Sequence, residues 1–173
     1  EPEALFDGLH HAREPLSMET TIVFMIDLLE KYGEDAEATY IVDNRELFFV
    51  PIVNPDGYEY NRRTNPNGGG YWRKNRRNNG GSTGVDLNRN YATGFGGPGS
   101  SGSGSSDTYR GPFAFSEPET AAVENFCKGR NLAMVFSVHT YTDILLRPWG
   151  TTSSHPSNRA QKSRCWSADR LKP

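Results

Sequence analysis

Blocks of apolar residues separated by polar stretches predict three strands along this chain. Residues 4–6 form a short apolar run, and residues 47–53 and 132–138 are almost continuously apolar. Continuous apolar runs of this length are typical of strands that are buried on both faces of a sheet. Asn54-Pro55-Asp56-Gly57 ends the run at 47–53 and predicts a turn.

Helical signals lie between these runs. Apolar residues recur at helical spacing over about 17–32, where Ser17 is placed to cap the helix and Gly33 to end it. Ser116-Glu117-Pro118-Glu119 fits a capping box that opens a second helix, which ends at about Lys128. Helices that alternate with apolar strands predict an α/β fold with a mostly parallel, mixed sheet flanked by helices.

Composition narrows the class of partner. The chain has 173 residues, of which 35% are hydrophobic and 12% aromatic, and this suits a folded domain. Its net charge is -2, and no apolar run approaches the length of a membrane-spanning helix. We therefore expect neither nucleic acid nor a membrane as a partner. The basic run at 71–77 keeps an RNA-binding module as an alternative hypothesis.

Residues 151–173 differ in character from the rest of the chain. They contain five basic residues and one acidic residue, and they show no apolar periodicity. We expect residues 1–150 to form one domain and residues 151–173 to be a divergent basic tail outside its fold.

Two histidines and one acid lie where an α/β fold gathers ligands. His11 and Glu14 follow the first predicted strand closely enough for one turn to bring them together, although such a pair also suits surface hydrogen bonding. His139 directly follows the strand at 132–138, at the edge where ligand sites of α/β sheets lie, although a structural role also suits it. Together they make a set that catalytic zinc uses, so we expect one Zn²⁺ per chain. His10 competes with His11, but side chains that are neighbours in a strand point apart, so one of the two is expected to bind.

Cationic and amide side chains follow in the middle of the chain. Arg73 lies within the basic run, and Asn88 and Arg89 are adjacent. An arginine grips a carboxylate through its planar fork, and an asparagine does so through its NH₂ group. A carboxylate clamp near zinc implies a substrate with a free C-terminus.

Seven short stretches resemble the zinc carboxypeptidases of the carboxypeptidase A type, and most of all the bacterial carboxypeptidase T branch. They occur in the family's order and span nearly all of residues 5–150. The stretches are Leu9-His10-His11-Ala12-Arg13-Glu14, Asn54-Pro55-Asp56-Gly57, Trp72-Arg73-Lys74-Asn75-Arg76, Asp86-Leu87-Asn88-Arg89-Asn90-Tyr91, Tyr109-Arg110-Gly111, Glu117-Pro118-Glu119-Thr120 and His139-Thr140-Tyr141.

The resemblance implies a zinc-dependent metallocarboxypeptidase that hydrolyses the C-terminal peptide bond of peptides and proteins. His11, Glu14 and His139 fall on the family's zinc ligands. Arg73 falls on the arginine that polarises the scissile carbonyl and stabilises the oxyanion. The resemblance also implies an extracellular location.

Substrate-binding roles follow in the same way. Asn88 and Arg89 fall on the pair that holds the terminal carboxylate of the substrate. Arg13 and Tyr141 fall on positions that line the neighbouring subsites.

The resemblance fades after Gly150, whereas family members continue well beyond that point. The continuation carries the general-base glutamate, which has no counterpart in this chain. We therefore expect residues 1–150 to be a partial zinc carboxypeptidase catalytic domain, truncated at both ends. The alternative is a catalytically inactive remnant that binds zinc and peptides.

Overall fold

A computed structural model describes residues 1–141 and 144–146 of the chain. Two compact units are distinguished, Glu1–Thr140 and Tyr141–Pro173, and the helices and strands given below lie in the first. The predicted basic tail at 151–173 lies outside the described residues, so its separation from the domain stays a prediction.

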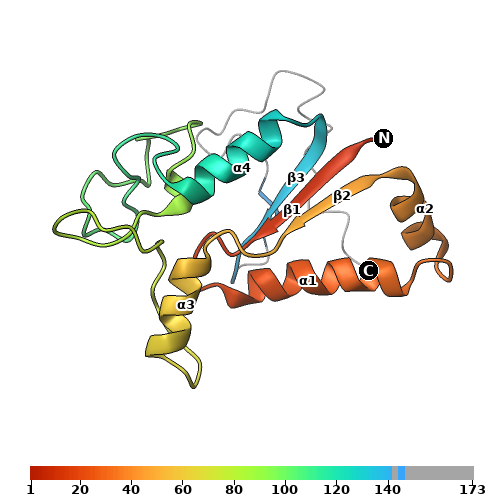
Figure 1. Cartoon of the computed structure of the whole chain (residues 1–173), viewed down its shortest axis with the longest axis horizontal. Coiled ribbons are helices and arrows are strands. Elements are labelled where there is room, and N and C mark those ends of the chain that lie inside the picture. Colours follow the sequence, from red (N-terminus) through yellow and green to blue (C-terminus); the bar gives the residue numbers. More distant parts are fainter. Residues whose placement is uncertain (142–143, 147–173) are drawn as a thin grey trace. The chain divides into compact units, whose positions relative to one another are not determined.

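Three parallel strands form the sheet of the first unit, in the order β2-β1-β3 (Figure 1). Their bounds are β1 Glu3–Gly8, β2 Glu46–Val50 and β3 Leu132–Val138. The central strand β1 is the most deeply buried, whereas β2 and β3 are half-exposed along much of their length. The predicted α/β fold with a parallel sheet is confirmed, and burial on both faces holds for the central strand alone.

Helices account for most of the other regular structure among the described residues. Their bounds are α1 Pro15–Glu30, α2 Ala36–Asn44, α3 Pro55–Thr64, α4 Pro118–Lys128 and the 3-10 helix η1 Leu87–Arg89. α2 and α3 have no counterpart among the predicted elements. The turn predicted at 54–57 is wrong, because the Asn54 side chain accepts the Gly57 N–H at 3.0 Å and thereby caps α3.

Two predicted helix caps are also wrong, and both side chains serve tertiary contacts instead. α1 begins two residues before Ser17, whose hydroxyl accepts the Leu9 N–H at 2.9 Å and so fixes the chain at the end of β1. Glu117 precedes α4 without capping it through its side chain. Its carboxylate accepts from Arg77 at 2.6 Å and from Asn75 at 2.8 Å.

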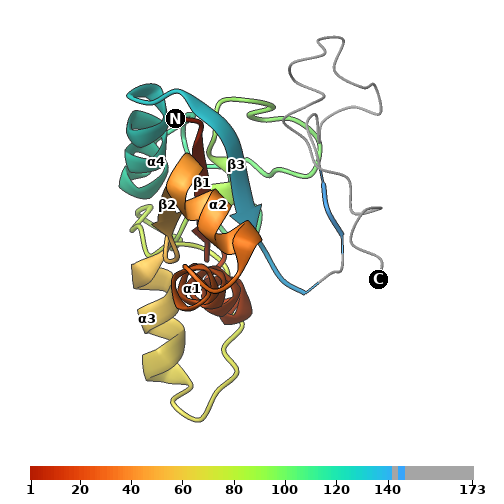
Figure 2. The ribbon, with the colours of Figure 1, turned by 90° about the vertical axis from the view of Figure 1, so that its right-hand side faces the viewer.

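α1 and α4 cover opposite faces of the sheet (Figure 1). Phe49 of β2 stacks on Phe6, whose ring lies 5.0 Å from that of Phe24 in α1. The next side chain along β2, Phe48, contacts Phe126 of α4 at 5.1 Å between ring centroids. Successive side chains of a strand point to opposite faces, so these contacts place one helix on each side. Figure 2 shows α1 nearly end-on against the sheet. Within the described residues, no helix is long and apolar enough to cross a membrane.

Candidate functional site

The turn after β1 carries two of the predicted ligands. Leu9 is fully buried and adopts a left-handed conformation with a φ of 56°, which turns the chain sharply. Gly8 allows this turn to pack against α1, because a Cβ there would lie 2.9 Å from the Ser17 carbonyl oxygen. The Glu14 N–H then donates to the His11 carbonyl at 3.0 Å, which brings the two side chains to the same side of the turn.

The third predicted ligand reaches the same place from β3. β1 and β3 are parallel neighbours with Gly8 paired to Val138, so their carboxyl ends share one edge of the sheet. His139 Nδ1 lies 3.2 Å from His11 Nδ1 and 3.0 Å from Glu14 Oε2, and His11 Nδ1 lies 2.8 Å from Glu14 Oε1. One ligand atom from each residue lies within 4.8 Å of the others, an arrangement that no other trio of such side chains makes in the described part of the chain.

The chemistry of this group suits a cation. The facing atoms of His11, Glu14 and His139 are two imidazole nitrogens and two carboxylate oxygens, so lone pairs oppose one another unless a proton or a metal lies between them. Burial raises the pKa of Glu14, but hydrogen bonds with His11 and His139 outweigh it and hold that pKa well below its usual range. The Thr140 N–H also donates to Glu14 Oε2 at 3.2 Å. An ionised carboxylate beside two imidazoles is a donor set that fits zinc.

A buried carboxylate lies behind His11. Asp86 Oδ1 is 3.3 Å from His11 Nε2, and Asp86 Oδ2 accepts from Arg73 at 2.9 Å and 3.1 Å. Burial raises the pKa of Asp86, but the nearby His11 and Arg73 outweigh it and lower that pKa below its usual value. A carboxylate at the second nitrogen of a ligating histidine fixes the ring and its tautomer. Sequence reasoning gave Asp86 no role, although it opens the stretch that holds Asn88 and Arg89.

Arg73 turns one remaining donor toward the ligand group. Asp86 engages its Nε and Nη2, while Nη1 lies 3.9 Å from Glu14 Oε1. Asn88 and Arg89 lie in η1, which begins directly after Asp86, and the Asn88 side chain is exposed. Arg89 Nε donates at 2.9 Å to a carbonyl of the glycine- and serine-rich loop that follows.

The two predicted subsite residues are both exposed. Arg13 is exposed, and its guanidinium pairs with Asp107 at 3.3 Å. Tyr141 is the first residue of the second unit and is 95% exposed.

His10 lies outside the group of three ligands. Its ring is buried, with Nε2 2.7 Å from the Tyr91 hydroxyl and Nδ1 3.3 Å from Ser137 Oγ. Burial, followed by the neighbouring histidines, lowers the pKa of His10 to about 3. Sequence reasoning assigned no role to Tyr91 or Ser137, although Tyr91 closes the stretch that holds Asn88 and Arg89, because a lone hydroxyl in a strand or loop carries no pattern of its own.

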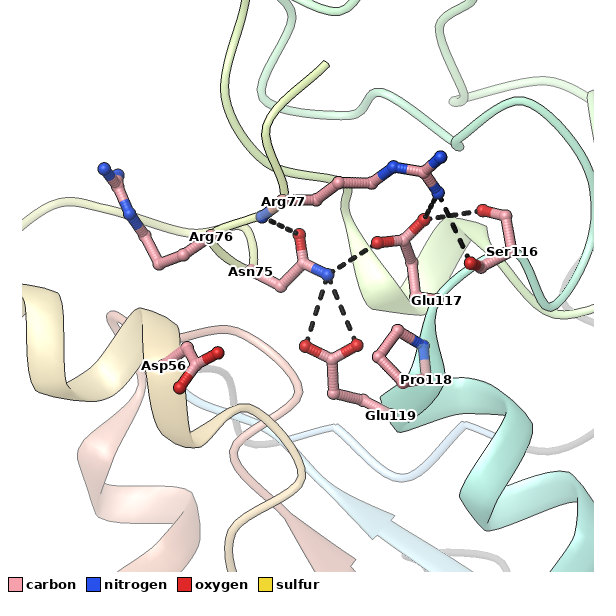
Figure 3. Close-up of a pocket in the computed structure, with 8 residues that line it drawn as sticks. All are labelled: Asp56, Asn75, Arg76, Arg77, Ser116, Glu117, Pro118 and Glu119. Carbon is pink, nitrogen blue, oxygen red and sulfur yellow. Dashed lines mark hydrogen bonds and ion pairs between the residues drawn. The ribbon is translucent and has the colours of Figure 1, made fainter.

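The side chains that line a separate polar pocket connect the loops of the site through hydrogen bonds (Figure 3). It has a volume of about 370 Å³ and is lined by Asp56, Asn75, Arg76, Arg77, Ser116, Glu117, Pro118 and Glu119. Asn75 Nδ2 donates to Glu117 at 2.8 Å, and Asn75 Oδ1 accepts the Val85 N–H at 2.8 Å. Arg77 pairs with the same glutamate at 2.6 Å, so these charges are matched within the pocket. Asn75 therefore connects the loop segment that carries Arg73 to the one that carries Asp86.

Comparison with known proteins identifies the family. The sequence matches the family described as zinc carboxypeptidase over residues 1–169. The chain belongs to the zinc carboxypeptidase family. Members of this family are peptidases that use Zn²⁺, in agreement with the ligand chemistry of His11, Glu14 and His139.

Individual relatives show how far the similarity extends. Carboxypeptidase A2 of Rattus norvegicus is 35% identical over 158 residues, which cover 91% of this chain and 37% of that protein. Carboxypeptidase A1 of Mus musculus is 38% identical over 153 residues, covering 88% of this chain and 36% of that protein. The chain thus spans little more than a third of the length of these relatives.

Solved structures agree with the fold. The crystal structure of thrombin-activatable fibrinolysis inhibitor superposes with a TM-score of 0.83 at 30% identity, covering 91% of this chain and 39% of that one. Carboxypeptidase A from Helicoverpa armigera superposes with a TM-score of 0.77 at 32% identity, covering 93% of this zinc carboxypeptidase chain and 38% of that one. These comparisons confirm the predicted family, whereas the carboxypeptidase T branch stays a prediction.

Proposed function

We propose that this chain carries the metal-binding part of a metallocarboxypeptidase that hydrolyses the C-terminal peptide bond of peptides and proteins. The observation that supports it most directly is the convergence of His11, Glu14 and His139, which would hold one zinc ion per chain. When bound there, zinc would act as a Lewis acid on the scissile carbonyl and lower the pKa of a bound water toward about 7.

Arg73 would stabilise the charge that develops on the carbonyl oxygen. Asp86 holds its guanidinium through Nε and Nη2, which leaves Nη1 directed toward the ligand group at 3.9 Å from Glu14. A donor that is fixed before the reaction stabilises the transition state without a cost for its own reorientation. Arg73 is therefore assigned a catalytic role.

Asn88 and Arg89 would bind the terminal carboxylate of the substrate. Both residues lie in η1, directly after Asp86, whose carboxylate is 3.3 Å from His11 Nε2, so Asp86 connects the proposed clamp to the ligand group. Binding the terminal carboxylate restricts attack to the last peptide bond through orientation. Arg13 and Tyr141 are proposed to line the neighbouring subsites, and extracellular peptide and protein C-termini are the proposed substrates.

The two glutamates at the start of α4, Glu117 and Glu119, are not proposed as the general base. Glu117 is fully buried and paired with Arg77, and Glu119 accepts from Asn75 at 3.2 Å. Both carboxylates lie in the polar pocket rather than beside His11 (Figure 3).

Zinc stoichiometry of the full chain tests the proposed metal site. The unaltered chain is expected to bind one zinc ion, His139→Ala to bind none, and His155→Ala, a matched substitution outside the ligand set, to bind one. Equilibrium dialysis followed by elemental analysis gives the ratio. Retention of one zinc ion by His139→Ala would disprove the ligand assignment.

Hydrolysis is tested separately from metal binding. The zinc-loaded chain is incubated with a peptide that has a free C-terminus and with the same peptide amidated at that end. Release of the last residue from the first peptide alone supports the carboxypeptidase. Stoichiometric zinc without release from either peptide would favour the inactive remnant for this chain.

A further inference from the structure

The second nitrogen of each proposed histidine ligand lies near a polar group of its own. His11 Nε2 lies beside Asp86, a contact described above. His139 Nε2 lies 3.4 Å from the hydroxyl of Ser137, two residues earlier in the chain. The same hydroxyl lies 3.3 Å from His10 Nδ1. One serine oxygen therefore stands between His139 and His10.

His10 is held firmly from its other side. Its Nε2 is 2.7 Å from the Tyr91 hydroxyl, and the Tyr91 ring makes an edge contact with Phe115 at 5.8 Å between centroids. The backbone is fixed as well, because Asn54 Nδ2 donates to the His10 carbonyl at 3.1 Å. The His10 ring is also stacked on the ring of His139, with centroids 5.6 Å apart and planes 30° apart. His10 is thus a fixed surface against which His139 rests.

We propose that His10 is a positioning residue for the metal ligand His139, acting through the shared hydroxyl of Ser137 and through ring stacking. The inference rests on the proposed function, since it takes His139 Nδ1 as the ligand atom. A neutral imidazole that binds a metal through Nδ1 carries its proton on Nε2, which then donates to Ser137 Oγ. The chain Tyr91–His10–Ser137 would hold the His139 ring with Nδ1 turned toward His11 and Glu14.

This role explains why a second, buried histidine lies beside the ligand His11. His10 is 3% exposed, and its ring nitrogens contact two hydroxyls from segments far apart in the sequence. Oδ1 of the buried Asp7 lies 3.4 Å from His10 Nδ1 and has no hydrogen-bond partner within the described residues. An apolar side chain of similar size at position 10 would fill the space but would leave the Ser137 hydroxyl without the contact that it makes with His10 Nδ1.

Two substitutions at position 10 distinguish the contact of Nδ1 with Ser137 from the contact of Nε2 with Tyr91. The amide of His10→Asn lies near the place of Nδ1 and can present either its oxygen or its NH₂ to Ser137. The longer His10→Gln places its amide near Nε2, so it keeps the contact with Tyr91 and loses that with Ser137. Ser137→Ala removes the shared hydroxyl at a position on the exposed side of β3, where a loss of folding is not expected.

The test measures zinc affinity of the full chain by competition with a chromophoric chelator, and the visible absorption spectrum of the Co²⁺-substituted chain. Ser137→Ala should weaken zinc binding about 10-fold, the lower end of the range for outer-shell partners, and alter the Co²⁺ bands. His10→Gln should change both in the same direction. His10→Asn keeps a polar partner for Ser137 but loses the ring, so its zinc affinity should lie between those of His10→Gln and the unaltered chain. Combining His10→Gln with Ser137→Ala should weaken zinc binding by less than the product of the two single effects, because both interrupt the path through Ser137.

A merely structural His10 predicts a different pattern. It would lower the thermal stability of the metal-free variants while their zinc affinity and Co²⁺ spectra stay unchanged, and that result would overturn the proposal. Affinity losses that add in the double variant would overturn it too. If the unaltered chain binds no zinc, or if His139→Ala still binds one ion, the proposed metal site itself fails. These outcomes are distinct from a failure of His10 alone.

Discussion

Replacing Asp86 by Asn tests how the site fixes its first histidine. The substitution keeps the shape of the side chain but removes its charge. Asp86 is fully buried, its Oδ2 receives two hydrogen bonds from Arg73, and its Oδ1 lies 3.3 Å from His11 Nε2. Loss of a carboxylate partner of a metal-binding histidine weakens metal affinity by about 10- to 100-fold, or about 1.4 to 2.8 kcal/mol.

The same change has a second consequence for stability. The Arg73 side chain is 11% exposed, so Asp86→Asn leaves a nearly buried guanidinium with only the Glu14 carboxylate, 3.9 Å away, as a counter-charge. Removing one member of a buried pair costs about 3–5 kcal/mol, and we expect the lower value because the amide oxygen still accepts a hydrogen bond. Zinc affinity is measured by chelator competition and stability by urea unfolding of the metal-free chain. Asp107→Asn is the matched control, because that aspartate is exposed and, within the described residues, forms an ion pair with Arg13 alone. An Asp86→Asn chain with the zinc affinity of the unaltered protein would refute the assignment of Asp86 to His11.

Two further predictions concern the frame of the domain and its surface. Asn90→Asp should destabilise the fold by about 3 kcal/mol in urea unfolding, because the buried Nδ2 donates to the Arg110 and Phe113 carbonyls at 2.8 and 3.0 Å, where a carboxylate would face bare oxygens. Asn78→Asp, which keeps its acceptor for the Gly80 N–H, should change stability by less than about 0.5 kcal/mol, and equal losses in both variants would contradict the reasoning. Hydrogen bonds from Arg62 and Arg63 lower the pKa of Glu59 to about 2. The stability that the ionised Glu59 contributes to the fold is therefore complete above the pKa of the unfolded chain and is lost as the pH falls toward 2. Carbon-13 NMR titration of Glu59 checks this, and an unshifted carboxyl in the folded chain would disprove it.

The sequence allowed the convergence of three candidate ligands at one edge of the sheet to be predicted for a clear reason. The apolar run at 132–138 and the short run at 4–6 each end directly before or near a histidine, and parallel neighbours bring their carboxyl ends together. The pairing of β1 with β3 therefore sets the distance between His11 and His139, although 128 positions separate them along the chain.

What the sequence did not reveal depends on contacts between distant segments. α3 contains Gly57 and, apart from Tyr58 and Tyr60, only polar residues after Pro55, so no recurring aliphatic residues indicated a helix. It is held instead by Asn61, whose Nδ2 donates to the carbonyls of Ala12 and Trp72 at 3.0 and 2.9 Å. The predicted capping box at the start of α4 failed for a similar reason, because the Ser116 hydroxyl donates to Glu117 and the Glu119 carboxylate accepts from Asn75, 44 positions away.

These distant contacts connect the frame to the chemistry of the site. Asn75 joins the loop after Arg73 to Val85 and, through Glu117, to the start of α4. The segment that ends at Val85 continues into Asp86. The side chains around the pocket of Figure 3 therefore hold the carboxylate that faces His11, although none of the three proposed metal ligands lines that pocket. Holding a side chain in one geometry has an entropic cost, and here a buried network of amides and carboxylates meets that cost before any metal binds. The sheet edge thus brings the ligands together, and the loops behind it decide how each ring is turned.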